Sequence, residues 1–173
     1  LKKELKILMT QDILIKNILR YLRIRWFKME PKKISGNRIF DNRGSVRFNN
    51  DLDFKNIKRF YTVHNYNKNF IRAWHGHLKE EKFIGCINGT FQVSAVKIDN
   101  KKKPNKKNKI FTFILNHSDN NFIYVPKGFA NGSMSLEDNS ELLIFSTASI
   151  KDSLNDDIRF DYKYWNPWII SQR

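Results

Sequence analysis

The chain has 173 residues, of which 40% are hydrophobic and 14% are aromatic. This composition is enough for one domain with a buried core, and it excludes a disordered chain, which has few aromatic side chains. No apolar run approaches the roughly 20 residues that a membrane-spanning helix needs. The single cysteine, Cys86, excludes an internal disulfide and predicts a reducing, cytoplasmic location. Because Cys86 lies in an apolar run, we expect it to be an inert core residue.

The formal net charge of +15 is typical of proteins that bind phosphate groups. Much of the excess lies in residues 1–28 and in the lysine-rich run 101–109. A lysine run that contains Pro and Asn between two apolar segments is typical of a solvated loop. The charge therefore allows a phosphate-bearing partner, and by charge alone a nucleotide diphosphate is as good a candidate as a polymer. With the rest of the sequence considered, we do not expect nucleic acid. A nucleic-acid or membrane-surface role is the weakest alternative.

The first 28 residues differ in pattern from the rest of the chain. Apolar residues recur there near helical spacing, with no Gly or Pro between them: Leu5, Leu8, Ile15, Leu19 and Leu22. This pattern predicts a basic, amphipathic helical extension that precedes a domain over 29–173. Contact of the extension with an acidic membrane surface, with a partner or with the domain is left open, as is a role as a mere appendage.

Short strands separated by turn signals follow from Pro31 onward. The predicted strands are Ser45–Phe48, Ile57–Val63, Phe70–Trp74, Lys82–Ile87, Thr90–Ile98, Ile110–Leu115, Phe122–Val125 and Glu141–Thr147. Asn88–Gly89 predicts a tight hairpin turn, and Pro126–Gly128 and Asn131–Gly132 predict further turns. A series of short strands with no helix between them predicts an all-β fold, as a closed or double-sheet antiparallel structure.

His75 and His77 are the first candidates for chemistry. Residues two apart on a strand face the same side of the sheet, so both imidazoles would point in one direction. This pair suits either a metal site, with help from Glu80 or Glu81, or an acid–base site. At the later position where a further histidine would complete a metal site, the chain has Asn131, which is a poor ligand for a transition metal. We therefore favour acid–base chemistry and expect no metal and no other cofactor.

Several motifs together resemble the dTDP-4-dehydrorhamnose 3,5-epimerase family. The matching segments, in order, are Asp41–Gly44, Arg72–His75, Lys82 with Gly89, Tyr124–Gly132 and Asp157–Asp161. The resemblance covers residues 39–167. It implies a cupin jelly-roll β-barrel, a homodimer and a metal-independent isomerase of polysaccharide biosynthesis. The implied substrate is a 4-keto-6-deoxy sugar attached to a nucleotide diphosphate.

The resemblance also implies roles for individual residues. His75 is expected to be the base that removes a proton next to the ketone, because imidazole titrates near neutral pH. Lys82 would hold the developing oxyanion by its charge. The remaining expected site residues bind the substrate, with the arginines on its diphosphate: Arg43, Arg72, Lys127 and Asn131.

The chain also departs from the family pattern. The family's catalytic tyrosine belongs near residues 149–150, where this chain has Ser149–Ile150. A substitute would come from the tyrosines Tyr61, Tyr66 or Tyr124. The carboxylate that orients the family's base near its C-terminus has no counterpart here.

Two alternatives to the epimerase are left open. His75-Gly-His77 followed by Lys79 is similar to the His-x-His-Lys of the 3,4-ketoisomerases, which share the barrel, and His77 would be their second proton shuttle. A sugar-binding cupin that has lost catalysis is the other alternative, and the missing tyrosine motivates it.

Overall fold

A computed structural model describes residues 29–169. The predicted helical extension over 1–28 lies outside these residues and stays a prediction. The described elements run in chain order as β1 (Lys32–Ile34), β2 (Asn37–Asp41), β3 (Gly44–Phe48), β4 (Arg59–Asn65), β5 (Ile71–His77), β6 (Lys82–Asn88), β7 (Thr90–Lys97), β8 (Ile110–Asn116), β9 (Phe122–Val125), β10 (Phe129–Ser135), β11 (Ser140–Ser146), α2 (Ile150–Asn155) and β12 (Ile158–Arg159).

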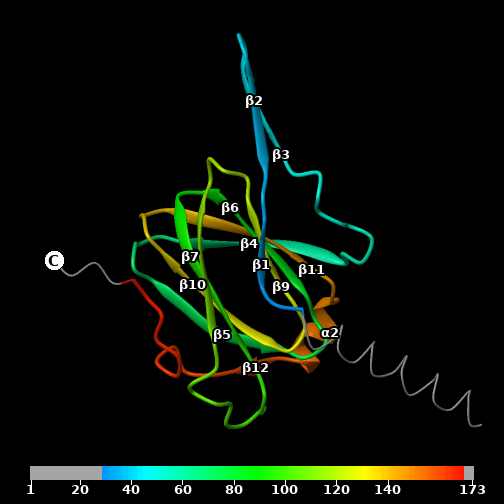
Figure 1. The fold of residues 1–173 in the computed structure, drawn as a ribbon, viewed down its shortest axis with the longest axis vertical. Helices are drawn as coiled ribbons and strands as arrows, with labels where there is room; N and C mark the ends of the chain where they lie inside the picture. The colour runs from blue at the N-terminus through cyan, green and yellow to red at the C-terminus, as the bar shows by residue number, and fades with distance from the viewer. Residues whose placement is uncertain (1–28, 170–173) are drawn as a thin grey trace, which may run out of the picture. The chain divides into compact units, whose positions relative to one another are not determined.

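Two five-stranded sheets face each other and enclose the core (Figure 1). The first sheet has the strand order β1-β9-β6-β11-β4, and the second has the order β12-β5-β10-β7-β8. Every strand pairing in the described residues is antiparallel. Strands that are neighbours in the chain mostly lie in different sheets, so the chain crosses repeatedly between the two layers. The predicted all-β, double-sheet fold is confirmed.

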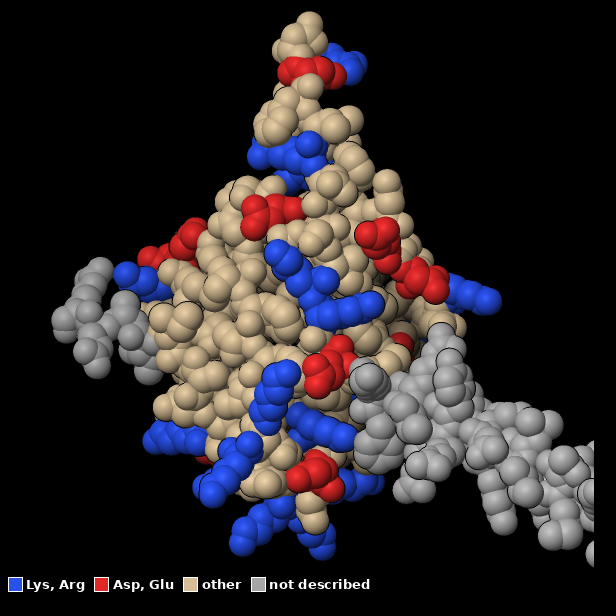
Figure 2. Space-filling view, in the orientation of Figure 1, with Lys and Arg blue, Asp and Glu red and all other residues tan. Residues whose placement is uncertain are grey.

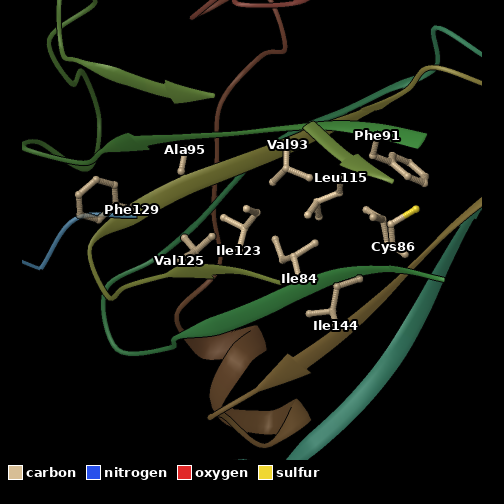
Figure 3. Packing of buried hydrophobic residues seen from close by; sticks show 11 residues of the cluster. Ile84, Cys86, Phe91, Val93, Ala95, Leu115, Ile123, Val125, Phe129 and Ile144 are labelled. Atoms are coloured by element: carbon tan, nitrogen blue, oxygen red, sulfur yellow. The ribbon is translucent and has the colours of Figure 1, made fainter. Parts of the chain in front are cut away.

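The main core lies between the two sheets. Along β7, alternate side chains of Phe91, Val93 and Ala95 point inward, because successive residues of a strand face opposite sides. They meet Ile84 and Ile123 of the first sheet, and Figure 3 shows these side chains directed toward one another. Burial of a Val, Ile or Phe side chain of this kind stabilises the fold by roughly 1.5–3 kcal/mol. The space between these strands is therefore filled by packed side chains and is not an open channel.

Cys86 belongs to the same core, where 6% of its surface is exposed. Burial raises the pKa of its thiol to about 12, so it stays protonated near neutral pH. This environment agrees with the prediction of an inert residue.

The C-terminal segment covers the outer face of the second sheet. Trp74 of β5 packs against Trp165 and Trp168, with ring centroids 5.5 and 5.1 Å apart. The buried Gln92 of β7 ties down the same segment: its side chain donates to the Pro167 carbonyl at 2.9 Å and accepts from the Ile169 amide at 2.8 Å. Both faces of the second sheet are thus packed, which fixes its strands in place.

One predicted hairpin and one predicted turn are wrong. Asn88–Gly89 does not close a hairpin, because β6 and β7 belong to different sheets and the turn carries the chain from one sheet to the other. Gly89 has a φ of +72°, and a Cβ there would lie 2.2 Å from Ser140 Oγ. Asn131–Gly132 lies inside β10, where it pairs with neighbours on both sides. In the sequence, Gly132 favours a turn, but in the structure it allows a close approach between strands.

A short helix, α2, was also not expected. Ser149 caps its N-terminus by accepting a hydrogen bond from the Asp152 amide at 3.1 Å. Six residues are too few to show a helical period in the sequence. No helix within residues 29–169 has the length and apolarity needed to cross a membrane.

The hairpin of β2 and β3 projects away from the two large sheets (Figure 1). Its apolar side chains are largely exposed, with Ile39 at 59%, Phe40 at 71% and Val46 at 59%. On the face drawn in Figure 2, basic and acidic side chains are interspersed, and basic ones are denser toward the lower part. The lysine-rich run 101–109 lies in the loop between β7 and β8, as predicted.

Candidate active site

A cavity of about 450 Å³ lies between the two sheets, beside the packed core. Strands β4, β6 and β11 of the first sheet form one wall, and β5, β10 and β12 of the second sheet form the other. This volume is within the range of small-molecule sites. The residues that line it are Tyr61, Val63, Phe70, Ile71, Arg72, Ala73, His75, Lys82, Ile84, Asn131, Gly132, Ser133, Leu142, Ile144 and Arg159.

A one-residue irregularity in β5 brings Arg72 and His75 to the same cavity. Residues three apart on a regular strand face opposite sides of a sheet. Here Asn131 pairs with His75 and Ser133 pairs with Arg72, so three steps along β5 match only two along β10. The extra residue shifts the phase of the strand, as in a β-bulge. Trp74 consequently packs on the outer face while both polar side chains line the cavity.

The surroundings of His75 favour its neutral form. Burial and the positive charges of Arg159 and Lys82 lower the pKa of the imidazole, while Asp157 opposes them. Arg159 is the register partner of His75 across β12 and β5. The Asn131 side chain donates to the His75 carbonyl at 2.9 Å and so ties β10 to β5. His75 is therefore held as a neutral base on the second sheet.

Lys82 and Tyr61 line the cavity from the first sheet. Lys82 is only 7% exposed, and burial lowers the pKa of its ammonium group. Burial and the Glu80 carboxylate raise the pKa of Tyr61 to about 12, although Arg59 acts in the other direction. Tyr61 is thus kept protonated, as a proton donor must be.

Three cationic side chains line the cavity: Arg72, Lys82 and Arg159. Arg72 is oriented by Asn65, whose Oδ1 accepts from its Nε at 2.7 Å. Arg159 is oriented by Asp157, with 2.6 Å between its Nε and the carboxylate. Among the described residues that form the lining there is no carboxylate. The cavity is therefore suited to an anion, and arginine donors are the usual partners of phosphate oxygens.

The structure brings four of the seven predicted site residues to this cavity: His75, Lys82, Arg72 and Asn131. The other three lie elsewhere. His77 is buried, with its Nδ1 3.3 Å from Glu80 Oε2. Arg43 is on the exposed β2–β3 hairpin and pairs with Asp41 at 2.6 Å. Lys127 lies 3.8 Å from Glu81, in a different, lysine-rich hollow.

The sequence did not indicate that two further residues, Arg159 and Glu80, would lie at or beside the site. Arg159 was part of a matching segment, but nothing in that segment indicated that β12 would run beside His75. Glu80, 3% exposed, was considered only as a metal ligand. The side chains of Arg59, His77 and Lys82 that surround it come from three strands that are distant in sequence or separated by a turn, so no local pattern could reveal this cluster. Within residues 29–169, no three His, Cys, Asp or Glu side chains gather as metal ligands would.

A sequence profile of the family described as dTDP-4-dehydrorhamnose 3,5-epimerase matches residues 33–173. The chain belongs to this family. It is a family of sugar epimerases within the isomerase class, so the family and enzyme class that the motifs predicted are confirmed. No curated protein matches the chain by sequence.

Solved structures of epimerases share the fold. The rmlC epimerase of Mycobacterium tuberculosis is 18% identical, with a TM-score of 0.65 over 80% of this chain and 74% of that one. The dTDP-4-dehydrorhamnose 3,5-epimerase of Bacillus anthracis, solved with TDP and PPi, is 19% identical, with a TM-score of 0.65 over 83% and 87% of the two chains. These likenesses confirm the cupin jelly-roll barrel.

A ketoisomerase has the same architecture. QdtA of Thermoanaerobacterium thermosaccharolyticum, a sugar 3,4-ketoisomerase solved with TDP, is 21% identical, with a TM-score of 0.61 over 79% of this chain and 93% of that one. Both enzyme types therefore share this fold, and the choice between them depends on the side chains of the site.

Proposed function

We propose that this protein is a nucleotide-sugar epimerase. It removes and returns a proton at a carbon beside the ketone of a nucleotide-diphosphate 4-keto-6-deoxyhexose, in polysaccharide biosynthesis. The observation that carries this proposal is the meeting of His75, Lys82 and Tyr61 in one cavity, with the base on one sheet and the two other groups on the facing sheet.

The first half of the reaction uses His75 and Lys82. Neutral His75 takes the proton from the carbon next to the ketone, and the electron pair of the broken C–H bond moves onto the ketone oxygen as an enolate. The Lys82 ammonium stabilises this oxyanion in a largely dehydrated site, where a single charge has a large effect. The lowered pKa of His75 keeps the base unprotonated at neutral pH.

The second half needs a proton donor on the opposite face of the sugar. The Tyr61 hydroxyl gives its proton to the carbon as the electron pair returns from oxygen, and the configuration inverts. Tyr61 lies on β4 of the first sheet, across the cavity from His75 on β5. Exchange with solvent then removes the proton from the imidazolium and restores the phenol. Tyr61 thus takes the place of the tyrosine that the family has near residues 149–150.

The diphosphate is assigned to the cations at the cavity. Arg72 and Arg159 are held by Asn65 and Asp157, so their guanidinium groups are oriented before the substrate binds. The relatives solved with TDP provide the parallel for a thymidine nucleotide. Asn131 supports the site by fixing the strand that carries His75.

The ketoisomerase alternative requires a second imidazole at the substrate. His77 is outside the cavity lining and is buried against Glu80. Among the described residues, His75 is the only histidine that lines the cavity. This arrangement favours epimerisation over ketoisomerisation.

Solvent deuterium exchange tests the proposal. Incubation with a dTDP-4-keto-6-deoxyhexose in D₂O should put deuterium at C3 or C5 and give an inverted product, and His75→Asn should abolish both. A 3-keto product would establish the ketoisomerase instead. Binding of dTDP without any exchange, over a panel of 4-keto sugars, would show a non-catalytic sugar-binding protein and overturn the enzyme proposal.

The homodimer that the family resemblance implies is part of this proposal. The exposed apolar side chains of the β2–β3 hairpin and of Phe60, which is 69% exposed, support it, because surfaces of this kind are usually covered by a partner. Light scattering should give twice the chain mass of 20.7 kDa. A reducing cytoplasmic location and a membrane contact of residues 1–28 stay predictions.

A further inference from the structure

A buried cluster of charged groups lies directly behind Lys82. Its centre is the carboxylate of Glu80, whose side chain is 1% exposed. Lys82 Nζ and Arg59 Nη2 lie 3.7 and 3.6 Å from Glu80 Oε1, and Ser146 Oγ donates to the same oxygen at 2.9 Å. On the other side, His77 Nδ1 lies 3.3 Å from Glu80 Oε2. One carboxylate therefore faces an ammonium, a guanidinium and an imidazole in the interior.

The cluster is outside the cavity, but it shares Lys82 with it. Lys82 is part of the cavity lining, whereas Glu80, His77 and Arg59 are not. Of the charged groups that act on Lys82, Glu80 has the largest favourable effect on its protonated form; Arg59 opposes it and the more weakly acting Asp157 supports it. Burial works against the ammonium, so its charge depends on a compensating carboxylate.

We infer that Glu80 is a positioning residue that keeps Lys82 protonated and directs its ammonium group into the cavity, while Arg59 and Ser146 hold the Glu80 carboxylate in place. The part that Lys82 plays in catalysis rests on the proposed function. The coupling between Glu80 and Lys82 does not depend on any substrate.

His77 lies against the same carboxylate without a hydrogen bond to it. Burial and Lys82 lower the pKa of His77, so the imidazole is neutral near pH 7 and does not compete with Lys82 for the negative charge of Glu80. Burial would raise the pKa of Glu80, but Lys82 and hydrogen bonds from Ser153 and Ser146 outweigh it. The carboxylate therefore remains ionised throughout the neutral range.

The other ionisable groups near the cluster come from three elements. Tyr61 and Arg59 face it from β4, His75 from β5, and Asp156 and Asp157 from the segment between α2 and β12. Only the two aspartates add negative charge, and Asp157 acts more weakly on Lys82 than Glu80 does. Glu80 is thus the group whose removal would change the ionisation of Lys82 most.

The test is an NMR titration of Lys82 in protein labelled with ¹³C-lysine, with the Lys82 signal assigned from its loss in Lys82→Met. Glu80→Gln keeps the shape of the side chain and removes its charge. We expect it to lower the pKa of Lys82 by about 1–3 units, the usual effect of one nearby opposite charge. Glu81→Gln is the matched control, because Glu81 is the adjacent carboxylate but pairs with Lys127 at 3.8 Å. Equal Lys82 titrations in the two variants would overturn the inference.

A second variant covers the case in which Glu80→Gln does not fold. By reciprocity of the coupling, Lys82→Met should raise the pKa of Glu80 by the same amount, read from the ¹³Cδ signal of labelled glutamate. An unchanged Glu80 titration in Lys82→Met would also overturn the inference.

Catalysis provides a separate readout. If deuterium exchange occurs, the alkaline limb of its pH profile should move to lower pH in Glu80→Gln, by the shift measured for Lys82, and Glu80→Asp should restore part of it. Exchange without the NMR shift would refute the role of Glu80 and leave the proposed function intact. The shift without any exchange would refute the proposed function and leave the coupling intact.

Discussion

At the scale of single residues, the site depends on which ionisation state each side chain is held in. His75 is kept neutral by burial and neighbouring cations, and Tyr61 is kept protonated by burial and a nearby carboxylate. A base and an acid are thereby available at the same pH, which proton transfer to and from one carbon requires. The environment of each group, and not its residue type alone, assigns it a role.

Replacement of Tyr61 by Phe should separate proton exchange from inversion. His75 can still remove a proton and return deuterium to the same face, so deuterium should still enter the substrate in D₂O. Inverted product should form at least about 100-fold more slowly, the usual contribution of a general acid. Proton NMR measures both quantities in one sample. Tyr66→Phe is the control, because Tyr66 is 73% exposed and outside the cavity lining. Unchanged inversion in Tyr61→Phe would contradict the assignment.

At the scale of elements, the contact between β5 and β10 determines the shape of the cavity wall. The irregular register between these strands puts Arg72 and His75 on one face. Gly132 lies at this point, and a Cβ there would be 2.5 Å from Ala73 Cβ and 2.9 Å from Trp168 Cη2. The close approach of the strands thus leaves no room for a side chain at this position.

Gly132→Ala should therefore destabilise the protein by about 1–3 kcal/mol, as other insertions into packed interiors do. Urea denaturation measures the change in the free energy of unfolding. Adding Ala73→Gly removes the nearest clashing methyl group, so the double variant should recover part of the loss. Additive losses in the double variant would show that the two positions are not in steric conflict.

At the scale of the whole molecule, buried ionisable groups link stability to pH. The pKa values of His75 and His77 are below the ordinary value of 6.5 in the folded protein, so the unfolded chain binds more protons as the pH falls below 6.5. The pKa of Glu80 is also lowered in the folded protein, so this carboxylate destabilises the fold in the same way below its ordinary pKa of 4.5. Acid should therefore destabilise the fold in two stages, histidines first and the carboxylate second.

The first stage can be measured by urea denaturation at pH about 7.5 and about 5.5. The free energy of unfolding should fall on acidification by at most about 1.4 kcal/mol for each histidine, because pH 5.5 is one unit below the ordinary pKa of histidine. His77→Gln should reduce this fall, because one of the two titrating groups is gone. Stability that is constant or higher at the lower pH would contradict the buried, neutral state of the histidines.

Much of this protein could be predicted from its sequence. The period of two in the strands and the turn signals between them are local properties, so the all-β class and most of the strands were predictable. The ordered motifs predicted the family, and they pointed to His75, Lys82, Arg72 and Asn131, which all line one cavity. Short motifs carry this information because each places a few chemical groups at spacings that the backbone preserves.

The tertiary structure alone decided how those elements combine. Which sheet a strand joins depends on long-range packing, so Asn88–Gly89 connects two sheets where a hairpin was expected. One extra residue in β5 changes the face on which the preceding side chains of the strand lie, so that Arg72 and His75 line the same cavity. Buried charges meet across strands, so the contact of Glu80 with His77, Lys82 and Arg59 exists only once the barrel has closed.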